Sequence, residues 1–309
     1  LLSKPQSIQE LGQRANQEDT IFPEPDKSTA TDRLFIVCDG MGGHESGEVA
    51  SSTVCQVLSE YILKHTNSDE EFTPEQFNEA LNVAYEELDK KDNGAVKKMG
   101  TTLALLRFHR SGCLIAHIGD SRIYHVRPSE KYIFHTRDHS LVNDLYDIGD
   151  WSSDVCSSDL ITQEEMKTSK QKNVITRAMQ PNQERRVKAD IRNITDIRPG
   201  DYFYLCSDGM LEEMEDENLL NILSDTSTTD EEKREILIKA TASNRDNHSA
   251  HLIHVLKVIK EKSEQPLKNT IGDTTSIPSQ KKFLKVITTI LFAVIIFLIA
   301  YLATTLFIK

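Results

Sequence analysis

Short apolar runs separated by turn-forming residues occupy most of the chain before residue 258. The runs at residues 34–38, 113–118 and 202–206 are continuous, which is typical of strands buried on both faces. Further strand-like runs lie at residues 101–107, 122–126, 131–135 and 187–194. Turns as short as Arg110-Ser111-Gly112 join neighbouring runs, so the pattern predicts antiparallel hairpins.

Other segments repeat their apolar residues at helical spacing. Residues 45–64 place Val49, Val57 and Tyr61 on one face. Thr73-Pro74-Glu75-Gln76 opens a second helix, with threonine as the N-cap and proline at the first position. Two more helices are predicted, at residues 211–223 and 230–242. Helices, then hairpins, then helices predict an α+β domain built from layers.

The end of the chain has a different pattern. Residues 283–308 are apolar apart from a few threonines and one charge, Lys285. As a helix they would reach about 39 Å, more than the ~30 Å hydrocarbon core of a bilayer. We expect a transmembrane helix here, because the alternative, a buried helix of a soluble domain, would show a polar face.

The flanks of this segment predict its orientation. Lys281 and Lys282 precede it, whereas only Lys309 follows it. The positive-inside rule therefore predicts a single-pass membrane protein whose folded domain is cytoplasmic. Residues 259–282 are rich in lysine, serine and threonine and are predicted to be a flexible linker, which leaves residues 1–258 as the folded domain.

Charge and cysteine content exclude some classes of function. The chain has 36 basic and 48 acidic residues and a formal net charge of -12, which argues against a nucleic-acid partner. Its 5 cysteines form no CxxC pair, so neither a zinc site nor a disulfide framework is predicted. Cys38, Cys113 and Cys206 lie in apolar runs, where free cysteine behaves as a small buried apolar residue.

Acidic residues recur where the predicted strands end. Asp39 begins the run Asp39-Gly40-Met41-Gly42-Gly43-His44, Asp208 precedes Gly209, and Asp120 follows Gly119. Taken singly, each aspartate is equally well explained as a turn former or a helix cap. Several such junctions in one domain favour a site for hard divalent cations, which prefer carboxylate oxygens.

These residues belong to a longer series of motifs that resembles the bacterial protein phosphatases of the phosphatase 2C type, a metal-dependent family. The series covers most of the chain before residue 258. Its members are Gly12-Gln13-Arg14, Gln17-Glu18-Asp19, Asp39 to His44, Gly47 to Ser51, Met99-Gly100-Thr101-Thr102, Gly119-Asp120-Ser121-Arg122, Asp138 to Val142, Asn173 to Ala178, Cys206-Ser207-Asp208-Gly209 and Asp246-Asn247.

The resemblance implies a four-layer α-β-β-α sandwich of two antiparallel sheets flanked by helices, to which the predicted transmembrane helix is added. It implies hydrolysis of phosphoserine and phosphothreonine in proteins by in-line attack of a water that bridges Mn²⁺ or Mg²⁺ ions. Two ions are implied, and a third that is held more weakly. Phosphorylated proteins would be the partners, together with a cognate serine/threonine kinase.

The family's site can be transferred residue by residue. Asp39 would bridge both ions, and the Gly40 carbonyl would bind one of them. Asp208 and Asp246 would hold the first ion, Asp19 the second, and Asp120 the third. Glu18 and Asn247 would lie beside these ligands.

Arg14 and His44 are the remaining predicted catalytic residues, with Asp39. Arg14 matches the family's phosphate-binding arginine, whose fork fits phosphate oxygens. His44 is a candidate general acid for the departing alkoxide. Animal members have the histidine directly after the Asp-Gly pair, where this chain has Met41, so a second role for His44 is to hydrogen-bond the loop or a ligand.

Two other functions were weighed. An inactive phosphoprotein-binding pseudophosphatase is the main alternative, but such proteins usually lose a ligand, and Asp19, Asp39, Asp208 and Asp246 are all present. A nucleotide-binding glycine loop needs Gly-Lys-Ser/Thr, and Gly43 is followed by His44.

Residues 151–160 interrupt the family pattern. They contain a repeated Ser-Ser-Asp, and without them the flanking sequences read on as the family's flap region, at about residues 144–172. The decapeptide resembles a translated sequencing adapter, so we interpret it as an assembly artefact. A true surface loop is the alternative, and resequencing the gene separates the two.

Overall fold

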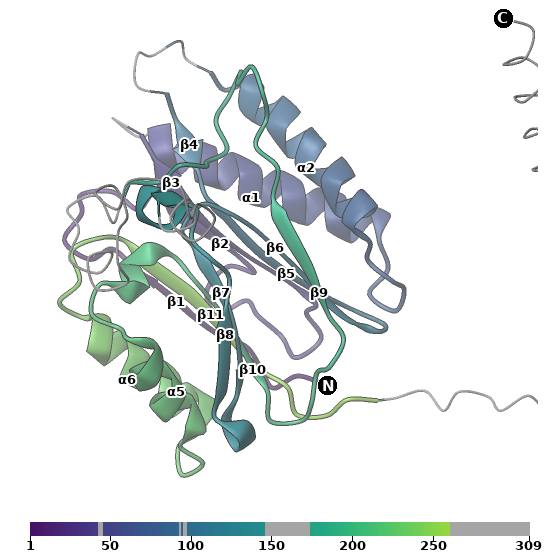
Figure 1. Ribbon diagram of the computed structural model, residues 1–309, viewed down its shortest axis with the longest axis vertical. Coiled ribbons are helices and arrows are strands. Elements are labelled where there is room, and N and C mark those ends of the chain that lie inside the picture. The colour runs from purple at the N-terminus through teal and green to yellow at the C-terminus, as the bar shows by residue number, and fades with distance from the viewer. Residues whose placement is uncertain (43–45, 93, 95–97, 146–173, 260–309) are drawn as a thin grey trace, which may run out of the picture. The chain divides into compact units, whose positions relative to one another are not determined.

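The computed structural model describes residues 1–42, 46–92, 94, 98–145 and 174–259 (Figure 1). Residues Leu1–Ile259 form one compact unit. The predicted segments at 151–160 and 283–308, and His44, lie outside the described residues. Among the helices that are described, none is both long enough and apolar enough to span a bilayer.

Two antiparallel sheets form the centre of the unit. The first has the strand order β1-β11-β10-β7-β8. Its strands are β1 (Gln6–Glu10), β11 (His248–His254), β10 (Tyr202–Cys206), β7 (Arg122–Arg127) and β8 (Tyr132–His135). The second has the order β2-β3-β5-β6-β9, with β4 paired to β3. Its strands are β2 (Asp19–Phe22), β3 (Leu34–Met41), β4 (Gly100–Thr101), β5 (Leu103–His109), β6 (Gly112–Ile118) and β9 (Asp190–Ile194).

Helices cover the outer face of each sheet. In Figure 1, α1 (Ser46–His65) and α2 (Pro74–Asp89) lie over the second sheet, and α5 (Asp216–Ser224) and α6 (Asp230–Thr241) lie beside the first. Short 3₁₀ turns, η1 (Pro128–Glu130) and η2 (Asp208–Leu211), follow β7 and β10. Thr73 caps α2 as predicted, since its hydroxyl accepts from Gln76 N–H while the Gln76 side chain accepts from Thr73 N–H.

Each interface between layers has its own apolar core. Leu58, Phe77 and Leu105 belong to the core between the helix pair α1–α2 and the second sheet. Phe35 and Phe203 belong to the core between the sheets. Tyr204 and Leu237 represent a third core, under α5 and α6. The layers therefore stack as α-β-β-α, and the predicted α+β class with two antiparallel sheets is confirmed.

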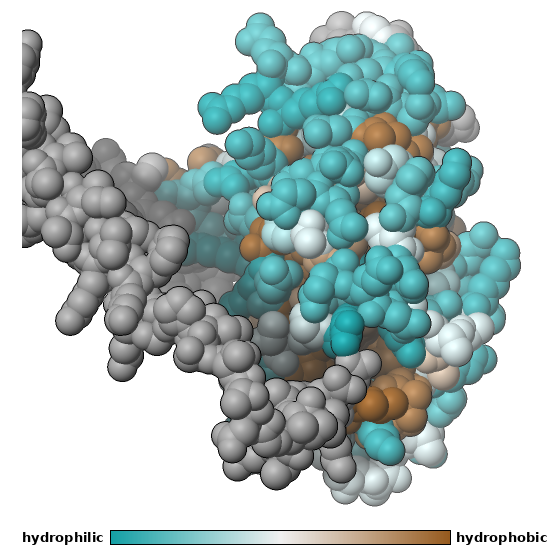
Figure 2. All heavy atoms as spheres, turned by 90° about the vertical axis from the view of Figure 1, so that its right-hand side faces the viewer, coloured by the Kyte–Doolittle hydropathy of each residue, from teal (hydrophilic) through white to brown (hydrophobic). Residues whose placement is uncertain are grey.

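The surface of the unit is mostly polar, in contrast to the three apolar cores. In Figure 2, hydrophilic residues dominate the visible part of one face, and apolar residues appear there as small separate patches. Cys38, Cys55, Cys113 and Cys206 are buried and free. Most large apolar side chains are therefore buried in the three cores, as the apolar runs of the sequence predict.

Some boundaries differ from the sequence predictions. The helix expected at 211–223 is present as α5, but its predicted start is wrong, because η2 ends at Leu211 and α5 begins only at Asp216. The carboxylate of the intervening Glu212 accepts hydrogen bonds from the backbone N–H groups of Arg245 and Asp246, at 3.0 and 3.2 Å. Glu215, directly before α5, has an extended backbone conformation. The strand expected at 187–194 begins at Asp190, and the run at 101–107 divides between β4 and β5.

A buried ion cluster joins β7 to the turn before β10. Asp201 is fully buried and accepts from His125 Nε2 at 2.8 Å, Arg127 Nε at 2.9 Å and the Arg198 N–H at 2.9 Å. Burial by itself would raise the pKa of Asp201, but these hydrogen bonds lower it to about 2.

Asp201→Ala should therefore lower the free energy of unfolding by about 3–5 kcal/mol, because Asp201 is the one fully buried carboxylate among the described partners of the buried Arg127 guanidinium. Urea denaturation measures the loss. Asp196→Ala is the matched control, since Asp196 also pairs with Arg127 but is 66% exposed, and should cost under about 1 kcal/mol. Equal losses in the two variants would contradict the role assigned to burial.

Candidate active site

The predicted aspartates converge at one end of the two sheets. Asp19 and Asp39 are direct partners in the register of β2 and β3. Asp208 follows β10, Asp120 follows β6, and Asp246 precedes β11. The carboxyl group of Asp39 interacts electrostatically with those of Asp19, Asp208 and Asp120, and that of Asp19 also with Asp246. The fold thus brings together all the aspartates that the sequence motifs singled out.

Backbone contacts position Asp39 and Gly40. The Asp39 N–H donates to Thr102 Oγ1 at 3.0 Å, and its carbonyl accepts from Thr102 N–H at 2.9 Å and Thr101 Oγ1 at 3.0 Å. A Cβ at Gly40 would lie 2.2 Å from the Gly47 carbonyl oxygen, so only glycine allows the start of α1 to approach so closely. The motif that contains Thr101 and Thr102 was recognised in the sequence, but no role was predicted for its threonines.

Asp19 is buried and has a hydroxyl partner. Ser207 Oγ donates to Asp19 Oδ2 at 2.8 Å and accepts from Ser249 N–H at 3.0 Å. Burial raises the pKa of Asp19 to about 7, and the charges of Asp208 and Asp246 add to this effect. The hydrogen bond from Ser207 lowers the pKa, but burial outweighs it. Sequence reasoning missed Ser207 as a partner, although its place next to Asp208 in the motif was a signal.

The other carboxyl groups are destabilised in the same way. Burial and the charge of Asp208 raise the pKa of Asp120 to about 8. Burial and the charge of Asp19 raise the pKa of Asp39 well above its usual value. Asp120 Oδ1 is buried and has no hydrogen-bond partner among the described residues. Mutually repelling carboxylates with an unsatisfied oxygen fit hard divalent cations, which supply the missing positive charge.

Asp246 lies at the edge of this cluster with Arg14. Arg14 Nη2 donates to Asp246 Oδ2 at 2.5 Å, and the Arg14 side chain is 56% exposed. Asn247 bridges two loops, since its Oδ1 accepts from Glu18 N–H at 2.8 Å and its Nδ2 donates to the Leu11 carbonyl at 2.9 Å. The structure therefore places Glu18 and Asn247 beside the aspartates, as the resemblance implied.

A second cluster lies next to Asp120. Among the described residues, His117, His139 and Asp190 form a group of three potential metal-binding side chains whose ligand atoms lie within 4.8 Å of one another. His139 Nδ1 accepts from Gly119 N–H at 3.0 Å, so its Nε2 carries the proton and donates to Asp190 at 3.1 Å. His117 Nε2 donates to the Arg137 carbonyl at 2.8 Å. Hydrogen bonds within the protein thus account for this cluster.

The raised pKa values predict how the stability of metal-free protein depends on pH. Because Asp19 and Asp120 have folded-state pKa values of about 7 and about 8, the folded state binds more protons than the unfolded state at neutral pH. Stability should fall as pH rises from about 4 to 8, by at least about 1.4 kcal/mol, the value of one pKa unit.

Thermal unfolding with a chelator at pH 5.5 and pH 8.5 measures this trend. Mn²⁺ should raise the melting temperature most at the higher pH, and Asp120→Asn should flatten the pH dependence. Equal stability at both pH values without metal would contradict the proposed repulsion.

Comparison with known proteins agrees with these features. A sequence model of the protein phosphatase 2C family matches residues 13–257. Protein phosphatase PhpP of Streptococcus pneumoniae is 29% identical over 249 residues, which cover 80% of this chain and 95% of PhpP. The crystal structure of the Mycobacterium tuberculosis serine/threonine phosphatase PstP is similar to this structure, with a TM-score of 0.68 and 26% sequence identity. The match covers 83% of this chain and 100% of the PstP chain.

A further PstP structure, of the catalytic domain in complex with 2 manganese ions, has a TM-score of 0.65 and 27% identity, covering 83% of this chain and 99% of that one. The family that the sequence motifs predicted is thereby confirmed. The chain belongs to the protein phosphatase 2C family and is a serine/threonine protein phosphatase, a hydrolase.

Proposed function

We propose that this phosphatase is an active, metal-dependent enzyme whose site is the aspartate cluster with Arg14. The observation that supports this most directly is the convergence of Asp19, Asp39, Asp120 and Asp208, whose carboxyl groups repel one another. Such repulsion costs stability, and bound cations would relieve it. The PstP catalytic domain with its manganese ions favours Mn²⁺ as the first cation to test, with Mg²⁺ beside it.

Each residue has a proposed task. Asp39, Asp208 and Asp246 would hold the first ion, and Asp19 and Asp39 the second. The Gly40 carbonyl would bind one of these two, and Asp120 would hold a third. When bound, the ions screen the phosphate charge and lower the pKa of a water. Thr101 and Thr102 hold the Asp39 backbone, and Ser207 orients the Asp19 carboxylate.

Arg14 binds the phosphate of the substrate. Its side chain is more than half exposed and belongs to the loop that packs against Asp246. A guanidinium offers two parallel N–H groups to two phosphate oxygens, which orients the phosphorus for in-line attack by water. The P–O bond to the serine or threonine oxygen breaks, and that oxygen takes up a proton as it leaves.

Hydrolysis of a phosphothreonine peptide by the full chain tests the proposal. We expect phosphate release with Mn²⁺ or Mg²⁺, none with excess chelator, and little from the matching phosphotyrosine peptide. Peptide binding without phosphate release in the presence of either ion would instead support a pseudophosphatase.

His44 is proposed as the general acid that protonates the leaving oxygen. If so, His44→Ala should slow alkyl phosphates about 10²-fold or more but aryl phosphates with acidic leaving groups much less. Rates across a series of leaving-group pKa values measure this. An equal loss for all substrates would show that His44 acts on the loop or on a metal ligand instead.

Residues 283–308 are proposed to anchor the enzyme in the membrane, with the phosphatase domain in the cytoplasm next to membrane-bound phosphoproteins and a cognate kinase. The support is the apolar length of the segment and the lysines before it. Flotation of the full chain with lipid vesicles, compared with a chain that ends at Gln280, tests the anchor. Equal flotation of the two chains would contradict it.

A further inference from the structure

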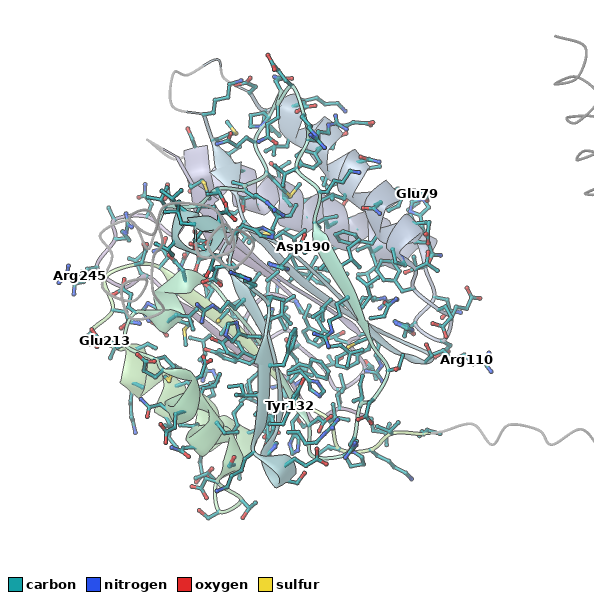
Figure 3. All side chains as sticks on the ribbon, viewed as in Figure 1. Glu79, Arg110, Tyr132, Asp190, Glu213 and Arg245 are labelled. Carbon is teal, nitrogen blue, oxygen red and sulfur yellow. The ribbon has the colours of Figure 1, made fainter. Side chains whose placement is uncertain are left out.

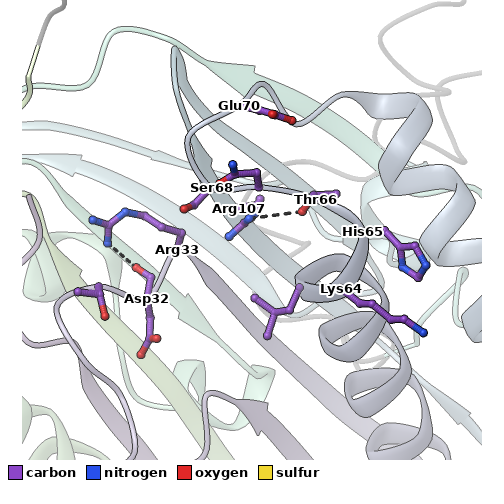
Figure 4. Close-up of a pocket in the computed structure, with 11 residues that line it drawn as sticks. Asp32, Arg33, Lys64, His65, Thr66, Ser68, Glu70 and Arg107 are labelled. Carbon is purple, nitrogen blue, oxygen red and sulfur yellow. Dashed lines mark hydrogen bonds between the residues drawn. The ribbon is translucent and has the colours of Figure 1, made fainter.

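A cationic pocket lies at the other end of the sheet from the aspartate cluster. It has a volume of about 550 Å³ and is formed by the loop before β3, the C-terminal end of α1 and the segment after it, and Arg107 of β5 (Figure 4). Arg33 precedes β3 and Asp39 lies near its end, so at about 3.3 Å per residue the two are separated by about 20 Å. In Figure 3, Arg245, next to Asp246, and Arg110, near Arg107 in sequence, likewise lie on opposite sides of the molecule.

Arg107 is the central feature of this pocket. The residue is only 2% exposed, yet none of the described carboxylates forms an ion pair with it. Its Nη2 has one long hydrogen bond, 3.4 Å to Thr66 Oγ1, and its buried Nε has no partner. Burial and the nearby charge of Arg33 lower the pKa of Arg107. A guanidinium has five N–H donors, and the described residues provide one hydrogen-bond acceptor for them, Thr66 Oγ1.

Other cations complete the lining. Arg33 is half-buried, and within the described part of the chain it donates to two backbone carbonyls, those of Ala30 at 3.0 Å and Asp32 at 2.8 Å. Lys64 lies exposed in the last turn of α1. The acidic residues of the pocket are Asp32 and Glu70, and neither pairs with Arg107 (Figure 4). The Asp32 carboxylate accepts from Thr29 N–H at 2.7 Å.

We propose that this pocket binds a phosphate group, either free inorganic phosphate or a phosphorylated side chain, at a site separate from the catalytic one. Two guanidinium groups and an ammonium outweigh the two carboxylates of the lining, Asp32 and Glu70, so the pocket keeps a net positive charge that favours an anion. The ligand supplies acceptors to the Nη N–H groups of Arg107, for which the described residues provide only the long hydrogen bond to Thr66. A helix C-terminus could attract Arg107 by its dipole, but the described carbonyls at the end of α1 accept no hydrogen bond from it.

Nuclear magnetic resonance of the full chain with ¹⁵N-labelled arginine tests the proposal. Inorganic phosphate is added in the presence of a chelator, and the Nε–H signals of the arginines are followed. The Arg107 signal, assigned by its loss in Arg107→Lys, should shift and saturate. Lys64→Gln, an exposed substitution that leaves the core intact, should weaken this binding about tenfold, as expected for loss of one charged contact.

Two controls separate this site from other effects. Arg14→Gln removes the proposed catalytic phosphate contact and should leave the shift of Arg107 unchanged. Arg110→Gln removes the same charge from the neighbouring turn and should also leave it unchanged. An Arg107 signal that does not move with phosphate, or that moves equally in the Lys64→Gln protein, would overturn the proposal.

The nature of the ligand follows from a second titration, with a peptide that carries a non-hydrolysable phosphonate in place of phosphoserine. If the peptide shifts the same signals at about one tenth of the phosphate concentration, which corresponds to one more charged contact, the site takes a phosphorylated side chain. If it binds no better than phosphate, the ligand is the free ion.

Discussion

Asp39→Asn should abolish metal-dependent hydrolysis, with a fall in kcat of about 10³-fold or more, because an amide lacks the charge that would hold two cations. The same substitution should leave the metal-free protein as stable or raise its melting temperature, since it removes a buried carboxyl group whose ionised form is disfavoured by burial and by the neighbouring carboxylates. Phosphopeptide hydrolysis with Mn²⁺ and thermal unfolding with a chelator measure the two effects.

Opposite changes in activity and stability distinguish a lost ligand from a misfolded protein. Asp26→Asn is the matched control, because Asp26 is exposed and has a φ of 62°, a conformation that asparagine tolerates as well as aspartate. It should keep full activity. If Asp39→Asn retained hydrolysis within tenfold of the parent, the proposed role of Asp39 would be wrong.

Arg14→Ala should lower kcat/KM for a phosphopeptide by about 10²-fold, the value of roughly two charge-assisted hydrogen bonds. It should also raise the inhibition constant of inorganic phosphate, because substrate and product present the same oxygens. Stability should change little, since the Arg14 side chain is 56% exposed. Initial rates over a range of substrate and phosphate concentrations provide both constants.

Arg245→Ala is the control for charge. Arg245 is exposed and directly precedes Asp246, and it lies on the left side of the molecule in Figure 3. Its loss removes a positive charge from the surroundings of the site without removing the proposed phosphate contact. Equal effects of Arg14→Ala and Arg245→Ala would show that Arg14 acts only through the general electrostatic field.

The candidate site illustrates how function opposes stability in this fold. Asp19, Asp39 and Asp120 all have raised pKa values, and in each case burial is the largest cause. An apolar residue at any of these positions would avoid that cost. The buried Asp201 shows the contrast, because partners within the protein lower its pKa to about 2. Unpaired buried carboxylates therefore distinguish the candidate site from a structural ion cluster.

Strand ends were the most informative signal in the sequence. β3 and β10 were predicted because they are continuous apolar runs, and buried strands of this kind need no tertiary information to be recognised. Asp39 and Asp208 were recognised as candidate ligands because they come at the ends of these two apolar runs. β1 was not predicted, because Gln6–Glu10 has one large apolar residue, Ile8, and is a strand only through its pairing with β11.

Local sequence thus determined the α+β class, the helix caps such as Thr73, and the aspartates that end the strands, since these depend on periodicity and on neighbouring residues. The tertiary structure alone decided which residues support them. Ser207 reaches Asp19, and Asn247 reaches Glu18, across gaps of 188 and 229 residues. The buried Arg107, which forms no ion pair with any described carboxylate, was likewise invisible in the sequence, because burial and pairing are properties of the packed layers and not of any single segment.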